Sequence, residues 1–209
     1  WNATKCVSRS YVDYSAHYTC LFYQVMPNGR YFYQIQKGSN DTQASAIFTF
    51  RASVEQMNTQ RSVILGDMGW RNANGTIDAL KEWTNPIAPA GKYPLISHMM
   101  HAEDIAYSDM MHVGEENPDF ERVNDIWFDR VQPLTSAIPY NVAIGNHDIS
   151  ASLATEDHIL PGWQRNCTSY LNRWAMTSAT SKGQGALWYS YIVGNTRFIV
   201  INTETDYPN

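Results

Sequence analysis

Three short apolar segments, each followed directly by a cluster of polar residues, constrain the fold of this chain more than any other feature. The segments span residues 62–65, 95–100 and 141–144. Patterns typical of helices lie between them, and such alternation of strands and helices predicts an α/β fold. Ligands bind at the carboxyl ends of the strands in α/β sheets. We therefore expect the three polar clusters to meet at one point.

The intervening segments can be assigned from their caps and periodicity. Thr76 is expected to cap a helix that runs through Trp83. A second helix is predicted around residues 120–131, because its apolar residues recur at intervals of three and four. Residues 150–182 are rich in loop-forming residues, and residues 188–202 form a predicted hairpin around Gly194-Asn195.

The first 52 residues have a different pattern, which predicts β-structure. Strands are expected at residues 18–26, 31–35 and 46–50, with a turn at Pro27-Asn28-Gly29. Several antiparallel strands in so short a stretch suggest part of a β-sandwich.

Composition excludes several classes of protein. Hydrophobic residues make up 44% of the 209 residues and charged residues 17%, which argues against a disordered chain. No apolar run approaches the roughly 20 residues that span a bilayer. The net charge of -5 argues against a protein that binds nucleic acid through its phosphates. A small phosphorylated substrate remains compatible with this charge, since a bound metal can supply local positive charge.

The polar clusters carry a set of oxygen donors and one imidazole. The donors Asp67, Asp104, Tyr107 and Asn146, together with His147, suit hard or borderline cations such as Fe(III), Mn(II), Mg(II) or Zn(II). Two cations close together need a carboxylate that bridges them. Taken one at a time, Asp67 can also be read as a turn residue and Tyr107 as a core tyrosine. His98 and His101 are three positions apart on a predicted strand, so they point to opposite faces and a structural role is favoured over a zinc site.

The clusters in order resemble the motifs of a known family. Gly66-Asp67-Met68-Gly69, then residues 104–109, then Gly145-Asn146-His147-Asp148 are similar to the GDxG, GDxxY and GNH(E/D) blocks of the purple acid phosphatases, within the metallophosphoesterase superfamily. The resemblance implies that residues 58–209 form the first half of an α/β/β/α metallophosphoesterase sandwich. It also implies that residues 1–57 form the end of a fibronectin-III-like β-sandwich domain.

The resemblance implies a function and a role for each site residue. It implies an acid phosphatase that hydrolyses phosphate monoesters at a dinuclear centre of Fe(III) and a divalent metal (Zn, Mn or Fe), through metal-activated hydroxide. Asp67 would bind the trivalent iron, Asp104 would bridge both ions, and Tyr107 would coordinate the iron as a phenolate. Asn146 would bind the divalent ion. His147 would contact the phosphate or protonate the leaving group, as the pKa of histidine suits that role.

Two departures from the family pattern keep an alternative open. The later histidine blocks of the family, VxxH and GHxH, do not occur among the 209 residues, so a remaining C-terminal part of the protein is expected to complete the site. Glu103 stands where the family has a glycine, and a positive φ at that position would strain the backbone by about 1–3 kcal/mol. The alternative is therefore a catalytically degenerate relative that serves as a structural or cell-surface glycoprotein. A phosphodiesterase of the same superfamily is a third reading, against which Tyr107 argues.

Cysteines and sequons indicate the compartment. Cys6 and Cys20 are candidates for a disulfide between adjacent strands, which leaves Cys167 without a partner. Four Asn-x-Ser/Thr sequons begin at Asn2, Asn40, Asn74 and Asn166 and would carry glycans in a secreted protein. We therefore expect secretion or a lysosome-like lumen, and both ends of the chain are expected to be cuts through a longer protein. A homodimer is compatible with the sequence.

Overall fold

A computed structural model describes residues 6–9, 16–22, 24–36, 44–52, 61–71, 73–84, 96–109, 120–149 and 167–205. In chain order its elements are β1 (Cys6–Arg9), β2 (His17–Cys20), β3 (Arg30–Tyr33), β4 (Phe48–Arg51), β5 (Ser62–Leu65), α1 (Asn74–Thr84), β6 (His98–Ala102), α2 (Phe120–Thr135), β7 (Tyr140–Ala143), α3 (Thr168–Arg173), α4 (Ser178–Ser181), β8 (Tyr189–Val193) and β9 (Thr196–Val200). No helix among these described residues is long and apolar enough to cross a membrane.

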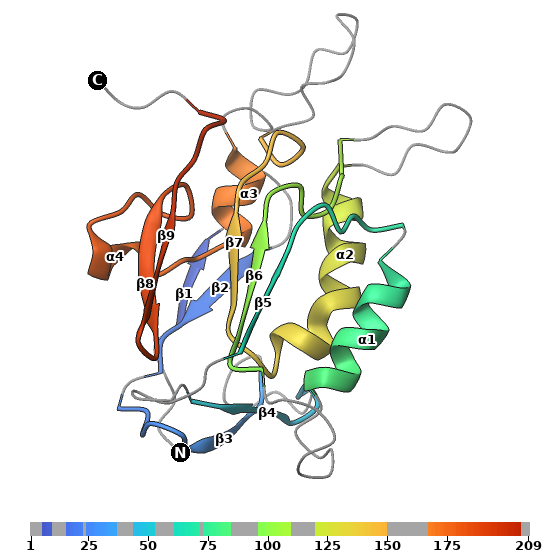
Figure 1. Cartoon of the computed structure of the whole chain (residues 1–209). Coiled ribbons are helices and arrows are strands. Elements are labelled where there is room, and N and C mark those ends of the chain that lie inside the picture. Colours follow the sequence, from blue (N-terminus) through green and yellow to red (C-terminus); the bar gives the residue numbers. More distant parts are fainter. Residues whose placement is uncertain are drawn as a thin grey trace, which may run out of the picture.

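A parallel sheet in the order β5-β6-β7 lies at the centre of the molecule. Helices α1 and α2 lie on one side of this sheet, and the antiparallel hairpin β8–β9 lies on the other (Figure 1). The larger apolar core fills the space between the sheet and the helices, and a smaller one lies between the sheet and the hairpin. The predicted mixed α/β class is confirmed, with all three predicted strands in one sheet.

Strand β6 is the middle strand and is buried on both faces, as expected for a parallel sheet covered on each side. His98 Nε2 lies 2.7 Å from the hydroxyl oxygen of Tyr191 in the hairpin. His101 Nδ1 lies 2.8 Å from the hydroxyl oxygen of Tyr140, and its ring packs against Trp127 of α2. The two histidines therefore face opposite layers, and the structural role favoured from their spacing is confirmed.

The helices begin and end close to the predicted positions. Helix α1 begins at Asn74 and not after Thr76, because the first backbone hydrogen bond runs from Ile77 N to Ala73 O at 2.8 Å. The expected cap at Thr76 is thus wrong by three residues, since Ala73 occupies the cap position. Helix α2 extends four residues beyond the predicted end and includes Pro133. Residues 150–182, expected to be loops, also contain the short helices α3 and α4.

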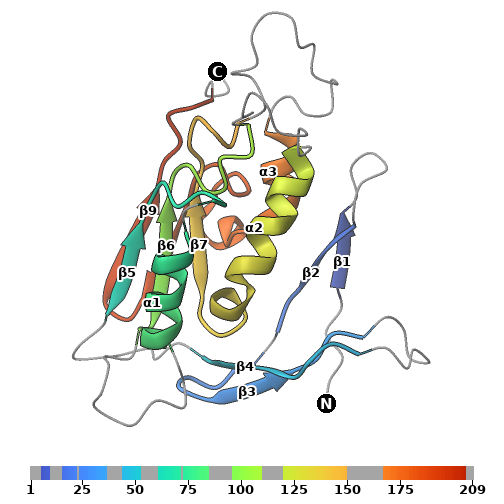
Figure 2. The ribbon, with the colours of Figure 1, turned by 90° about the vertical axis from the view of Figure 1, so that its right-hand side faces the viewer.

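The N-terminal strands form two separate two-stranded sheets within the described residues. Strand β1 pairs with β2, and the disulfide Cys6–Cys20 joins them, as predicted; the remaining cysteine, Cys167, is buried and reduced. The expected strand at residues 18–26 is wrong beyond Cys20, although the turn after Met26 is present. Figure 2 shows β3–β4 below the parallel sheet and β1–β2 beside α2. The predicted domain boundary at residues 57/58 lies outside the described residues.

Both strand histidines are expected to make the fold sensitive to acid. Burial lowers the pKa of His98 to about 4 and that of His101 to about 3. The unfolded chain therefore binds more protons than the folded one below the ordinary histidine pKa of about 6.5. The contribution of the two histidines to the free energy of unfolding should be fully present above that pH. The free energy of unfolding should then fall as the pH decreases toward about 4. Urea unfolding measured across this range should show a shallower decline for His98→Gln, which keeps a polar group near Tyr191 but does not titrate. A decline as steep as that of the wild-type protein would show that His98 does not cause the loss of stability in acid.

Candidate metal centre

Two of the predicted clusters meet at the hydroxyl group of Tyr107. This hydroxyl donates a short hydrogen bond to Asp67 Oδ1. The same hydroxyl lies 3.3 Å from Asp104 Oδ2. Asp67 follows β5, whereas Asp104 and Tyr107 follow β6, so the carboxyl ends of two parallel strands supply three oxygen atoms to one place.

The third cluster joins them through its backbone. His147 N donates to Asp104 Oδ1 at 3.1 Å. Gly145 has to be a glycine, because a Cβ at this position would lie 2.2 Å from Asp104 Oδ1 and 2.4 Å from Asp104 N. Asn146 lies between Gly145 and His147 in the same turn, and it is exposed. The structure thus brings all five predicted site residues to one edge of the sheet.

The loops after β5 and β6 are joined along their backbones. Asp67 N donates to Glu103 O at 3.4 Å, Gly69 N to Ile105 O at 3.1 Å, and Trp70 N to Ala106 O at 3.1 Å. Several residues of these loops have a positive φ: Asp67, Gly69, Glu103, Asp104 and Tyr107. Such conformations are rare outside glycine and persist where the surrounding structure enforces them. Their concentration here sets this edge apart from the rest of the described chain.

Asp148 links two loops of the candidate site, a role that the sequence reasoning did not assign to it. Its carboxylate accepts a hydrogen bond from Gly145 N at 3.0 Å and another from Ile105 N at 3.1 Å. It therefore ties the loop after β7 to the loop after β6. Burial raises the pKa of Asp148 to about 7, although its two backbone hydrogen bonds act in the opposite direction. The signal that could have found it is the acidic fourth position of the GNH(E/D) block.

Asp109 is the second residue that sequence reasoning missed. Both of its carboxylate oxygens lie near His147 Nδ1, at 2.8 and 2.9 Å, and its side chain is fully buried. Burial raises the pKa of Asp109, and the bond to His147 opposes this shift. The His147 ring also packs against Tyr107, with 4.4 Å between the ring centres. With Nδ1 held by Asp109, Nε2 is the ring nitrogen that this contact leaves available.

The charges at this place fit a cation. Two carboxylates, those of Asp67 and Asp104, contact the same phenol hydroxyl. Burial raises the pKa of Tyr107, and the hydrogen bond to Asp67 raises it further, so the hydroxyl keeps its proton and bridges the carboxylates. A hard cation would relieve this crowding of oxygen atoms in the same way. Within the described part of the chain, no group of three or more His, Cys, Asp or Glu side chains is arranged so that it could hold a metal ion.

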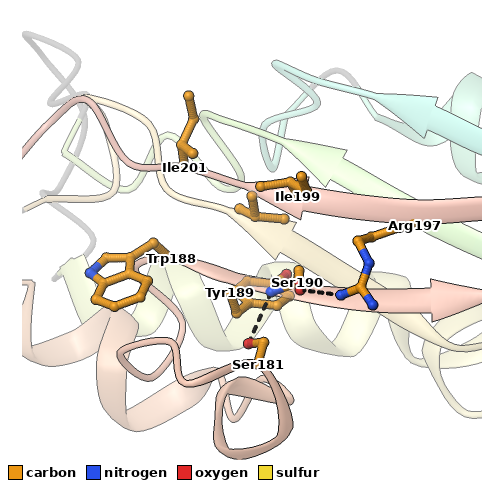
Figure 3. A pocket seen from close by; sticks show the side chains of 8 residues that line it. Ser181, Trp188, Tyr189, Ser190, Arg197, Ile199 and Ile201 are labelled. Atoms are coloured by element: carbon orange, nitrogen blue, oxygen red, sulfur yellow. Dashed lines mark hydrogen bonds between the residues drawn. The ribbon is translucent and has the colours of Figure 1, made fainter.

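A separate open pocket of about 370 Å³ lies on the outside of the hairpin β8–β9 and contains none of the predicted site residues. Figure 3 shows two hydrogen bonds at this pocket. Arg197 donates to the Ser190 hydroxyl, and the backbone N–H of Ser190 donates to the Ser181 hydroxyl. Trp188, Ile199 and Ile201 give it an apolar lining. The pocket is distinct from the strand-end cluster.

Comparison with known proteins gives relatives of one kind. An acid phosphatase of Aspergillus ficuum is 26% identical over 88% of this chain and 40% of its own length. A probable inactive purple acid phosphatase of Arabidopsis thaliana is 26% identical over 85% of this chain and 29% of its own. The structure of the purple acid phosphatase PPD1 from yellow lupin matches with a TM-score of 0.72 and 20% identity, over 97% of this chain and 38% of that one. No family model matches the sequence.

These relatives confirm the resemblance drawn from the three clusters. The chain is a distant relative of the purple acid phosphatases and acid phosphatases, and it shares the fold of a purple acid phosphatase. It spans less than half the length of each of the three proteins compared.

Glu103 lies at a strained backbone position, as its place in the glycine position of the motif predicts. Its φ is +68°, a left-handed conformation that favours glycine. Its side chain is exposed. Glu103 therefore occupies a backbone position that favours glycine, with its side chain in contact with solvent.

Replacing Glu103 by glycine should stabilise the protein. The gain from relieved backbone strain is partly offset by the greater freedom of glycine in the unfolded chain, and we expect Glu103→Gly to raise the free energy of unfolding by about 0.5–1 kcal/mol. Urea unfolding gives this value. Glu103→Ala is the matched control, since it removes the charge but keeps a Cβ. An equal gain in Glu103→Ala would assign the effect to charge and contradict the role of backbone strain.

Proposed function

We propose that this chain is part of an acid phosphatase that hydrolyses phosphate monoesters at a dinuclear centre of Fe(III) and a divalent ion, Zn, Mn or Fe. The proposal rests on the contact of the Asp67 and Asp104 carboxylates with the Tyr107 hydroxyl. The turn that holds Asn146 is hydrogen-bonded to Asp104 through its backbone. Relatives described as acid phosphatases support the same reaction class.

Each residue has a proposed role in holding the two ions. Asp67 and Tyr107 would bind the iron, Asp104 would bridge, and Asn146 would bind the divalent ion. When bound, two such cations supply neutralisation of the phosphoryl oxygens and a more acidic water. Four oxygen ligands are too few for two cations, so we propose that a further C-terminal segment of the same protein provides the remaining ligands.

The other residues of the site would position the substrate and move a proton. Asp109 holds His147 Nδ1, which directs Nε2 toward the leaving oxygen of a phosphate ester, to which it would deliver a proton. Asp148 keeps the loops after β6 and β7 together, so that Asp104 and Asn146 stay in fixed relation. Exposed Asp67 and Asn146 side chains leave the site open to a substrate from solution.

The alternative is a catalytically degenerate glycoprotein with a structural or cell-surface role. Glu103 at a glycine-like backbone position favours it, and one relative is described as probably inactive. The meeting of the Asp67, Asp104 and Tyr107 oxygen atoms favours the enzyme instead, because the oxygen donors of the site are in place. In either case we propose a secreted or lumenal protein, which the Cys6–Cys20 disulfide supports. We also propose that the N-terminal strands belong to a fibronectin-III-like domain.

Metal content separates the two functions. The full-length protein, purified without chelator, should contain iron and a second metal, absorb visible light through the phenolate of Tyr107, and hydrolyse an aryl phosphate at mildly acidic pH. Tyr107→Phe should lose the visible absorbance. A colourless, metal-free preparation of wild type without hydrolysis would contradict the enzyme and support the degenerate glycoprotein.

A further inference from the structure

One of the four predicted sequons lies wholly within the described residues. It is Asn74-Gly75-Thr76, at the start of α1. The acceptors of the other three, Asn2, Asn40 and Asn166, lie outside the described residues. The surroundings of this one sequon can therefore be tested for their ability to carry a glycan.

All three residues of this sequon are exposed. A Cβ placed on Gly75 would meet nothing within 4 Å, so open space surrounds the middle of the sequon. The buried side of this turn is formed by its neighbours Ala73 and Ile77, which are 1% and 3% exposed. The first turn of α1 thus presents the sequon outward, while its apolar side stays in the core.

The chain has a second mark of the compartment in which N-glycosylation takes place. The disulfide Cys6–Cys20 forms and persists in oxidising compartments such as the secretory lumen. A chain that acquires this disulfide in the lumen also meets the transferase and its lipid-linked sugar donor. The disulfide supports glycosylation independently of the exposure of the sequon.

We propose that Asn74 carries an N-linked oligosaccharide. The side-chain amide nitrogen of Asn74 attacks C1 of the terminal N-acetylglucosamine of a polyprenyl-diphosphate donor. The new N–C bond forms as the C–O bond to the diphosphate breaks, the amide loses one proton, and the polyprenyl diphosphate leaves. Thr76 supplies the hydroxyl that the acceptor sequence requires.

The glycan would stand near the candidate metal centre. Trp70 N is bonded to Ala106 O, which fixes the start of this segment against the loop that holds Tyr107. Asn74 follows Trp70 by four positions, which span at most about 14 Å. Figure 1 shows the start of α1 on the same side of the molecule as the strand ends. The modification itself does not depend on the proposed function, since it needs neither metal nor turnover.

Site mapping of the secreted protein tests the proposal. The full-length protein is secreted from yeast, treated with peptide N-glycosidase in ¹⁸O-labelled water, and digested for mass spectrometry. We expect the peptide that contains Asn74 to carry an ¹⁸O-labelled aspartate at that position. An unmodified Asn74 in the secreted wild-type protein would overturn the proposal, whatever the state of the other sequons.

Matched variants check that the sequon is the cause. Asn74→Gln and Thr76→Ala should each reduce the mass of the secreted protein by one glycan. Thr76→Ser keeps the sequon and should keep the glycan. Asn195→Gln changes an exposed asparagine in the β8–β9 turn that is not part of a sequon, and it should leave the mass of the glycans unchanged. Loss of the glycan in Thr76→Ser to the same degree as in Thr76→Ala would contradict the assignment.

Discussion

Asn146→Ala in the full-length protein is expected to abolish hydrolysis of a generic aryl phosphate and to leave the fold intact. Asn146 is exposed, so removing its amide opens no cavity in the core. The amide oxygen is the proposed ligand of the divalent ion, and loss of several kcal/mol of charge stabilisation lowers kcat/KM by about a thousandfold or more. Steady-state kinetics and metal content, measured on the same preparation, give the result.

A companion variant tests the bridging position. Asp104→Ala should be equally inactive, but it also removes the acceptor for His147 N and for the Tyr107 hydroxyl. Asp104→Asn keeps an acceptor there and lacks the negative charge, so it separates charge from shape. Asn195→Ala is the control for asparagine removal and should retain full activity. Retained turnover in Asn146→Ala or in Asp104→Asn would remove the proposed mechanism.

The strand-end residues could be predicted because their signals are local. A short apolar run followed by glycine and a polar residue identifies a strand and its end, and strand ends meet in an α/β sheet. Asp67, Asp104 and Asn146 were found in this way, and the structure brings them together. The positive φ that would strain the backbone at Glu103 is also present in the structure.

The contacts of the supporting residues could not be predicted, because their partners are distant in sequence. Asp109 reaches His147 across 38 positions and Asp148 reaches Ile105 across 43, and no periodicity marks such pairs. Helix α3 was missed because its six residues are too few to show a helical pattern. The extents of the N-terminal strands were overestimated, since aromatic and β-branched residues continue past Cys20 where pairing has ended.

A buried ion pair between α2 and α3 belongs to the same group of features that only the fold reveals. Arg173 Nη2 lies 2.7 Å from Glu121 Oε2, and the two side chains are 2% and 0% exposed. The Ser169 hydroxyl donates to the same carboxylate oxygen at 3.0 Å. Arg173 also reaches Asp125 at 2.7 Å, but the Asp125 side chain is 44% exposed. The Glu121 contact is therefore the one that is removed from water.

Arg173→Met is expected to lower the free energy of unfolding by about 3–5 kcal/mol, because it leaves the Glu121 carboxylate buried without its cation. Asp125→Asn breaks only the exposed pair and should cost less than about 1 kcal/mol. Adding Glu121→Gln to Arg173→Met removes the uncompensated charge and should recover part of the loss. Urea unfolding of the four proteins at neutral pH measures these differences. If Arg173→Met costs no more than Asp125→Asn, the buried pair does not hold α3 against α2, and α3 must be fixed by its apolar contacts around Tyr170 and Trp174.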